Sequence, residues 1–306
     1  MTGIAVTSSR AWLINALVTV ALWGVWGAFS GLSPQHGFPE TLVYCVWALT
    51  MIPPALVVLA QVGWKLDLSA KAIGYGLAIG LLGAGGQMVL FYAVARGPAY
   101  LIFPVISLSP VVTIALSALL MGERTGKLGM LGIVLALLAL PTFDFVPGSG
   151  GGASAVWLVP ALVVMLCWGV QAYFMKAANH VTSAESIFVY MMLTGLMLIP
   201  VAWAMTDFSK PINWGLDGPW LAALIQVLNA IGALTLVFAF RYGKAIIVAP
   251  LANAGAPLAT ALISLAVLGA VPGPLKAIGI LLALAASLLL AIEPDANEEP
   301  AAEAVA

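Results

Sequence analysis

Apolar stretches of about twenty residues recur along almost the whole chain, and short segments between them hold most of the charged residues. A helix needs about 20 apolar residues to cross a bilayer. Transmembrane β-strands would instead alternate polar and apolar residues, whereas runs such as LGIVLALLAL are apolar on every side. The pattern predicts an all-α integral membrane protein with ten transmembrane helices, at residues 11–30, 41–62, 72–94, 99–121, 127–143, 155–175, 186–206, 218–240, 245–269 and 274–292.

Composition narrows the class further, because 63% of the 306 residues are hydrophobic and only 8% are charged. A soluble domain would carry about a quarter charged residues. The sequence therefore excludes a soluble globular domain, a disordered chain and a nucleic-acid binder with a basic surface. Cys45 and Cys167 lie in apolar stretches without Cys-x-x-Cys spacing, so they are interpreted as buried thiols rather than as disulfide or metal sites.

The positive charges predict how the chain is oriented. Ten spans leave Arg96, Lys210 and Lys276 on one side of the membrane. The other side holds Arg10, Lys65, Lys71, Arg124, Lys127, Lys176, Arg241 and Lys244. Positive loops mark the cytoplasmic side, so both termini are expected in the cytoplasm. Arg10 before an apolar run is also seen in signal peptides, but the length of the first span and its three tryptophans favour a retained helix.

The two halves of the chain repeat each other. Trp23-Gly24-Val25 recurs as Trp168-Gly169-Val170 at an offset of 145 residues. Offsets of 146 and 147 relate further pairs: Tyr44 and Tyr190, Pro54 and Pro200, Gly97 and Gly243, Ala99 and Ala245, Pro104 and Pro250, Thr113 and Thr260, Ser117 and Ser264, Leu128 and Leu275, Gly132 and Gly279. A near-constant offset indicates duplication. Because each copy has five spans, the second copy must enter the membrane from the opposite side, and such inverted repeats are typical of transporters.

The repeat predicts the domain organisation. A cytoplasmic N-terminus (1–10) precedes the first five-helix repeat (11–143), and a glycine-rich linker (144–154) leads to the second repeat (155–292). The acidic tail (293–306) is expected to be disordered.

The paired Trp-Gly motifs, together with the segment from Gly97 to Gly132 that contains Met121-Gly122-Glu123-Arg124, resemble the EamA-type drug/metabolite transporter superfamily over residues 11–292. Within it, the chain is most similar to the YddG-type exporters of aromatic amino acids. The resemblance implies a bacterial inner (plasma) membrane carrier with a central cavity lined by spans 1, 3, 4, 6, 8 and 9. Glu123 matches the family's glutamate, but Ala270 stands at its place in the second copy. Glu123 is interpreted as a helix-end or loop contact near Arg124 and Lys127.

No ionisable residue falls near the middle of a predicted span, so coupling through a buried carboxylate is not expected. Neutral polar and aromatic residues remain as candidates, and spacings of three residues place Trp168 with Gln171, and Gln226 with Asn229, on shared helix faces. The predicted substrate-binding residues are Trp23, Gln87, Tyr92, Tyr100, Pro104, Ser107, Trp168, Gln171, Gln226, Asn229, Pro250 and Asn253.

Each class of candidate has a structural alternative. The amides can serve interhelical hydrogen bonds. Tryptophans near span ends belong to interfacial belts, which is the interpretation given to Trp12, Trp64, Trp157, Trp214 and Trp220. The prolines of spans 4 and 9 either break those helices and free backbone groups for substrate, or merely kink them in packing.

The sequence thus predicts an alternating-access exporter of amino acids, chiefly aromatic and other apolar ones, or of related small metabolites, through an uncharged central cavity. A nucleotide-sugar or phosphorylated-metabolite exchanger is the rival within the superfamily, with Arg96, Arg241 and Lys244 as its only candidate cations. An enzyme is not expected, because no buried base stands near a nucleophile. No cofactor or metal is implied. The expected partners are a small-molecule substrate and the lipid bilayer, without nucleic acid, and a monomer is compatible with the sequence.

Overall fold

A computed structural model describes residues 10–94, 105–106, 108–144, 157–268 and 273–292, and every regular element in this part of the chain is a helix. Helices lie within the predicted spans, of which the fourth is described only from residue 105 and without residue 107. The helices are α1 (Ala11–Phe29), α2 (Leu32–Gln35), α3 (Glu40–Thr50), α4 (Ile52–Gln61), α5 (Ala70–Val94), α7 (Ser109–Leu120), α8 (Lys127–Asp144), α9 (Leu158–Ala178), α10 (Ala184–Met197), α11 (Ile199–Ala204), a π-helical turn (Leu216–Trp220), α12 (Leu221–Tyr242), α13 (Ala245–Leu268) and α14 (Pro274–Ala291).

The helices fit a multi-pass membrane protein. Among the described residues, six helical segments are long and apolar enough to cross a bilayer: 11–35, 40–61, 70–90, 158–178, 184–204 and 216–242. Shorter apolar helices cover 109–120, 127–139, 245–260 and 274–290.

The second and seventh spans each consist of two helices. The first of these spans changes from α3 to α4 at Met51, and the other from α10 to α11 at Leu198. Prolines stand in the first turn of both second segments, where their missing N–H costs no intrahelical hydrogen bond. Pro54 and Pro200, which are related by the offset of 146, therefore mark equivalent breaks.

The prolines of the fourth and ninth spans behave differently from each other. α7 begins at Ser109 with Pro110 in its first turn, after a turn in which Leu108 N donates to Val105 O. In contrast, α13 continues unbroken from Ala245 to Leu268, past Pro250. Of the two alternatives for the prolines of the ninth span, the structure therefore favours packing within a continuous helix over a break.

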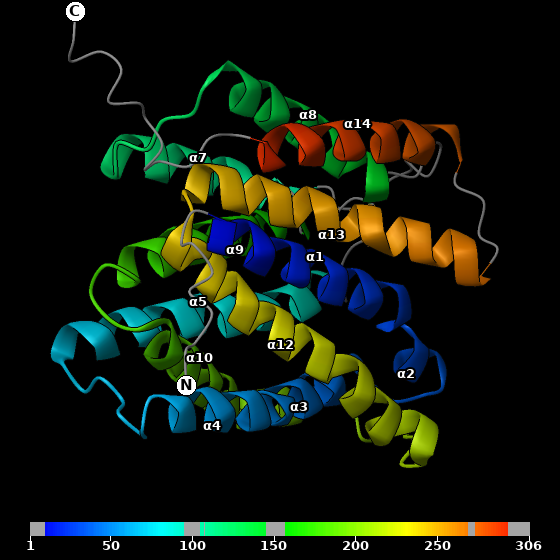
Figure 1. Cartoon of the computed structure of the whole chain (residues 1–306). Coiled ribbons are helices and arrows are strands. Elements are labelled where there is room, and N and C mark those ends of the chain that lie inside the picture. The colour runs from blue at the N-terminus through cyan, green and yellow to red at the C-terminus, as the bar shows by residue number, and fades with distance from the viewer. Residues whose placement is uncertain (1–9, 95–104, 107, 145–156, 269–272, 293–306) are drawn as a thin grey trace, which may run out of the picture.

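Helices from the two halves alternate through the bundle (Figure 1). From one end to the other, the picture shows α8 with α14, then α7 and α13, then α1 and α9, then α5 and α12, and finally α3, α4 and α10. α1 packs on α12 and α13, whereas α9 packs on α5 and α7. Each half thus inserts its first long helix between two helices of the other half.

Candidate functional site

Trp23 and Trp168 make matching contacts on different helices. The indole Nε1 of Trp23 donates to the backbone oxygen of Asn229 on α12 at 3.2 Å, and that of Trp168 donates to Gly83 O on α5 at 3.3 Å. Each indole also lies against a glycine of the helix that accepts its hydrogen bond: Trp23 against Gly232 and Trp168 against Gly86. A β-carbon at either glycine would collide with the ring. Asn229 and Gly83 differ by 146 residues, as do the two glycines.

The same correspondence holds at other helix contacts. The hydroxyl of Thr260 on α13 donates to Gly24 O at 3.1 Å, and that of Thr113 on α7 donates to Gly169 O at 2.9 Å. Close approaches of α8 and α14 occur at Gly132, next to Leu290 and Leu289, and at Gly279, next to Thr142. Each contact has a counterpart in which the two halves have exchanged places.

The α1/α12 interface comprises Trp23, Trp26, Gln226, Asn229 and Gly232, and Trp47 of α3 lies beside it. Its amides are occupied by indole groups: Trp26 Nε1 donates to Gln226 Oε1 at 3.0 Å, and Trp47 Nε1 donates to Asn229 Oδ1 at 2.8 Å. Gln226 is buried, with 5% of its surface exposed. For Gln226 and Asn229 the structure therefore supports interhelical hydrogen bonding, the alternative to substrate binding.

The α9/α5 interface comprises Gly83, Gly86, Gln87, Trp168 and Gln171. The amide of Gln171 lies so close to Gly83 that a β-carbon there would collide with it. Gln87 follows Gly83 by one helical turn. Both glutamines are half-buried, and neither hydrogen-bonds to another of the described residues. An unsatisfied amide is costly in hydrocarbon, so these two side chains are the candidates to meet water or substrate.

Of the other predicted site residues, the structure describes Tyr92, Pro250 and Asn253. Tyr92 lies near the end of α5 and is 44% exposed. The amide nitrogen of Asn253 donates to Ala249 O on its own helix at 2.9 Å, and Pro250 is buried in α13. Tyr100, Pro104 and Ser107 lie outside the described residues.

A set of charged residues ties the helices together at the end of the bundle predicted to be cytoplasmic. Lys176 of α9 is buried, and its Nζ donates to Gly243 O, just after α12, at 2.6 Å. Glu123 Oε2 accepts from the backbone N–H of Ile246 at 2.9 Å, in the first turn of α13, where a carboxylate is favourable. Lys244 Nζ donates to Arg124 O at 3.0 Å. Glu123 is thus a helix-end contact, but its partner is α13.

Lys176 was predicted only as one of the positive charges on the cytoplasmic side, and its contact with Gly243 was not predicted. The signal was that this lysine directly continues an apolar helical run, Ala172 to Met175. The sequence also assigned Trp12 to an interfacial belt, whereas Trp12 is 6% exposed and packs against Gly243. Trp64, Trp214 and Trp220 are largely exposed, as a belt requires. Among the described residues, no group of three His, Cys, Asp or Glu side chains could hold a metal ion.

Comparison with known proteins identifies the family. The profile of the EamA-like transporter family matches residues 10–141 and, a second time, residues 155–292. The chain belongs to the EamA-like transporter family. Because the two matches cover both halves, each half is related to the same family sequence.

Individual relatives are more distant. The pseudopaline exporter CntI of Pseudomonas aeruginosa is 28% identical over 186 residues, which cover 60% of this chain and 62% of that exporter. An uncharacterized protein of Methanocaldococcus jannaschii is 33% identical over 70 residues, 23% of this chain and 51% of its own. A solved crystal structure superposes with a TM-score of 0.77 at 18% identity, over 92% of this chain and 96% of that one. This last similarity shows the fold alone.

Proposed function

We propose that this EamA-family protein exports amino acids, chiefly aromatic and other apolar ones, or related small metabolites by alternating access. The observation that carries the proposal is the exchange of contacts between the halves, above all Trp23 with Asn229 and Trp168 with Gly83. Because the two halves make equivalent contacts, each half can adopt the conformation of the other. Such an exchange opens the transport path first on one side of the membrane and then on the other.

The proposed architecture is ten transmembrane helices in two inverted five-helix repeats, at residues 11–143 and 155–292. The double match of the family profile supports these limits. The excess of lysine and arginine on one side supports cytoplasmic termini in a bacterial inner membrane.

The substrate contacts are proposed to centre on the α9/α5 interface. Trp168 offers a broad aromatic face, and Gln87 and Gln171 offer amides that no other described residue occupies. A few polar groups beside aromatic walls are typical of small-molecule sites. Without a fixed charge there, selectivity would be broad among apolar side chains, since one methylene is worth about 1–3 kcal/mol in such a pocket. The pseudopaline exporter among the relatives supports export of a small metabolite.

Transport by the purified full-length chain in proteoliposomes tests this function. We expect labelled tryptophan and leucine loaded on one side to exchange with unlabelled amino acid on the other, with and without a pH gradient to reveal proton coupling. Empty liposomes provide the background. A nucleotide sugar and a sugar phosphate are assayed in parallel. Exchange of the phosphate esters alone would favour the rival carrier, and no flux of any amino acid above background would overturn the proposal.

A further inference from the structure

A pocket of about 510 Å³ opens at the end of the bundle predicted to be cytoplasmic, away from the α9/α5 interface. Residues 65–67 between α4 and α5, residues 179–183 between α9 and α10, and Arg241 near the end of α12 line it. Its volume lies in the range of small-molecule sites. Because the walls come from both halves of the chain, the pocket lies where the two repeats meet.

The pocket holds charges of both signs. Lys65 and Arg241 are exposed, and neither forms an ion pair with an acid among the described residues. The backbone N–H of Ser69, 2.9 Å from Asp67 Oδ1, and the nearby hydroxyls of Thr182 and Ser69 hold the pKa of the Asp67 carboxyl below its ordinary value. Asp67 is therefore negative at neutral pH.

The loop that carries Asp67 is held in place by α10. The hydroxyl of Tyr190 donates to Asp67 O at 2.8 Å, and the backbone N–H of Asp67 donates to Ser186 Oγ at 3.1 Å. The carboxylate is thus fixed before any ligand arrives, which reduces the entropy that binding would cost.

The wall after α9 is also held in place. Asn179 Nδ2 donates to Met175 O and to Val237 O, at 2.8 and 3.1 Å, which fixes the orientation of this amide. The Thr182 hydroxyl, on a residue only 8% exposed, lies beside the Asp67 carboxylate. Both walls of the pocket are therefore in place before a ligand arrives.

We propose that this pocket binds free α-amino acids by their two charged groups. The ammonium donates to the Asp67 carboxylate, while the carboxylate is bound by Lys65 and Arg241 through charge-assisted hydrogen bonds. A phosphate ester would satisfy the two cations but would face the Asp67 carboxylate. The inference rests on the proposed function: an exporter takes its substrate from the cytoplasm, and this pocket is its first docking site.

Equilibrium binding of labelled leucine to the full-length protein in nanodiscs tests the proposal. N-acetyl-leucine lacks the ammonium and leucinamide lacks the carboxylate, so both should compete poorly. We expect Asp67→Asn and Arg241→Gln each to weaken pocket binding by about tenfold, the usual effect of losing a charge-assisted hydrogen bond. Measuring both in a Gln87→Ala/Gln171→Ala background reduces the contribution of the α9/α5 interface.

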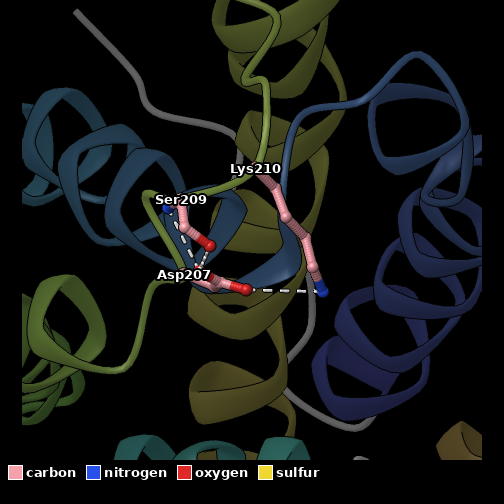
Figure 2. A network of polar contacts seen from close by, with 3 residues as sticks. All are labelled: Asp207, Ser209 and Lys210. Atoms are coloured by element: carbon pink, nitrogen blue, oxygen red, sulfur yellow. Dashed lines mark hydrogen bonds and ion pairs between the residues drawn. The ribbon is translucent and has the colours of Figure 1, made fainter.

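Asp207→Asn is the matched control. Asp207 lies in the loop after α11 and, like Asp67, accepts from the backbone N–H of the serine two residues later, at 3.1 Å. Figure 2 shows this carboxylate with Ser209 and with Lys210, whose Nζ is 3.4 Å away. Its replacement should leave binding unchanged.

Two results would overturn the pocket: wild-type affinity in both Asp67→Asn and Arg241→Gln, or equal competition by N-acetyl-leucine and leucine. Proteoliposome flux separates this failure from failure of the proposed function. If only the pocket is wrong, wild-type protein transports and Asp67→Asn keeps its KM. If the function is wrong, wild-type protein shows no flux, whatever it binds.

Discussion

The α1/α12 and α9/α5 interfaces share a framework and differ in how their polar groups are used. Both have an indole that donates to a backbone oxygen and lies against a glycine. In the first, Asn229 also accepts from Trp47, and Gln226 accepts from Trp26. In the second, Gly83 stands at the place of Asn229, and Gln171 packs beside it without a hydrogen bond to the described residues. Duplication has thus preserved packing while one copy uses its amides for structure and the other leaves them available.

The largest expected effect on transport comes from replacing the glycine against which the indole packs in each interface. Gly86→Val and Gly232→Val should each lower transport by about tenfold or more, because a larger side chain displaces the indole and overpacking costs about 1–3 kcal/mol. Flux into proteoliposomes measures it. Gly85→Val is the control, since a β-carbon there meets no atom within 4 Å. Normal flux in Gly86→Val would show that the Trp168 contact is dispensable.

Replacing the amides should affect KM in one interface and stability in the other. Gln87→Ala and Gln171→Ala are expected to raise the KM for amino acids by about tenfold, the loss of one hydrogen bond to a charged ligand, with little change in melting temperature. Gln226→Ala should instead lower the melting temperature and leave KM nearly constant, because it deprives Trp26 of its acceptor. The reverse pattern would assign substrate binding to the α1/α12 interface.

Trp47→Phe sharpens the structural side of the comparison. It removes the donor to Asn229 Oδ1 but keeps an aromatic ring in place. Interhelical hydrogen bonds in membranes are worth about 0.6–1.7 kcal/mol, so unfolding in detergent should become easier by that amount. KM is expected to stay at the wild-type value. A melting temperature that does not move would mean that Asn229 finds another donor, such as water.

The smallest expected effect tests whether equivalent hydrogen bonds in the two halves contribute equally to stability. Thr113→Val removes the hydroxyl that donates to Gly169 O, and Thr260→Val removes the one that donates to Gly24 O. Each of these glycines follows a tryptophan of the repeated Trp-Gly motif. Each substitution should cost about 0.6 kcal/mol of stability, and the double variant about the sum. Thermal unfolding of the three proteins gives the comparison. Markedly unequal losses of stability would show that the two equivalent hydrogen bonds do not stabilise the protein equally.

Much of the fold could be predicted from the sequence. The length of the apolar runs is set by the thickness of the bilayer, and the repeated motifs at Trp23 and Trp168 can be recognised in the sequence by their constant offset. The breaks at Met51 and Leu198 were not predicted. Spans that remain apolar through a proline look the same whether the helix breaks, as before Pro200, or continues, as at Pro250.

The candidate site was predicted only as a list of residue types. Gln171 and Gln226 look alike in sequence, and what distinguishes them is a tryptophan that approaches from a distant segment. The contacts of Lys176 and Trp12 could not be predicted for the same reason, since their common neighbour Gly243 lies far along the chain. Local pattern reports which groups need a partner, whereas tertiary contacts decide which group supplies it.

The side chain of Lys176 joins two ends of the second half of the chain. Its hydrogen bond to Gly243 O connects the last turn of α9 to the turn between α12 and α13. Lys176→Met would leave that backbone oxygen without this donor, so we expect it to lower the melting temperature of the protein, measured by thermal unfolding in detergent. An unchanged melting temperature would show that the two ends are held together by packing alone.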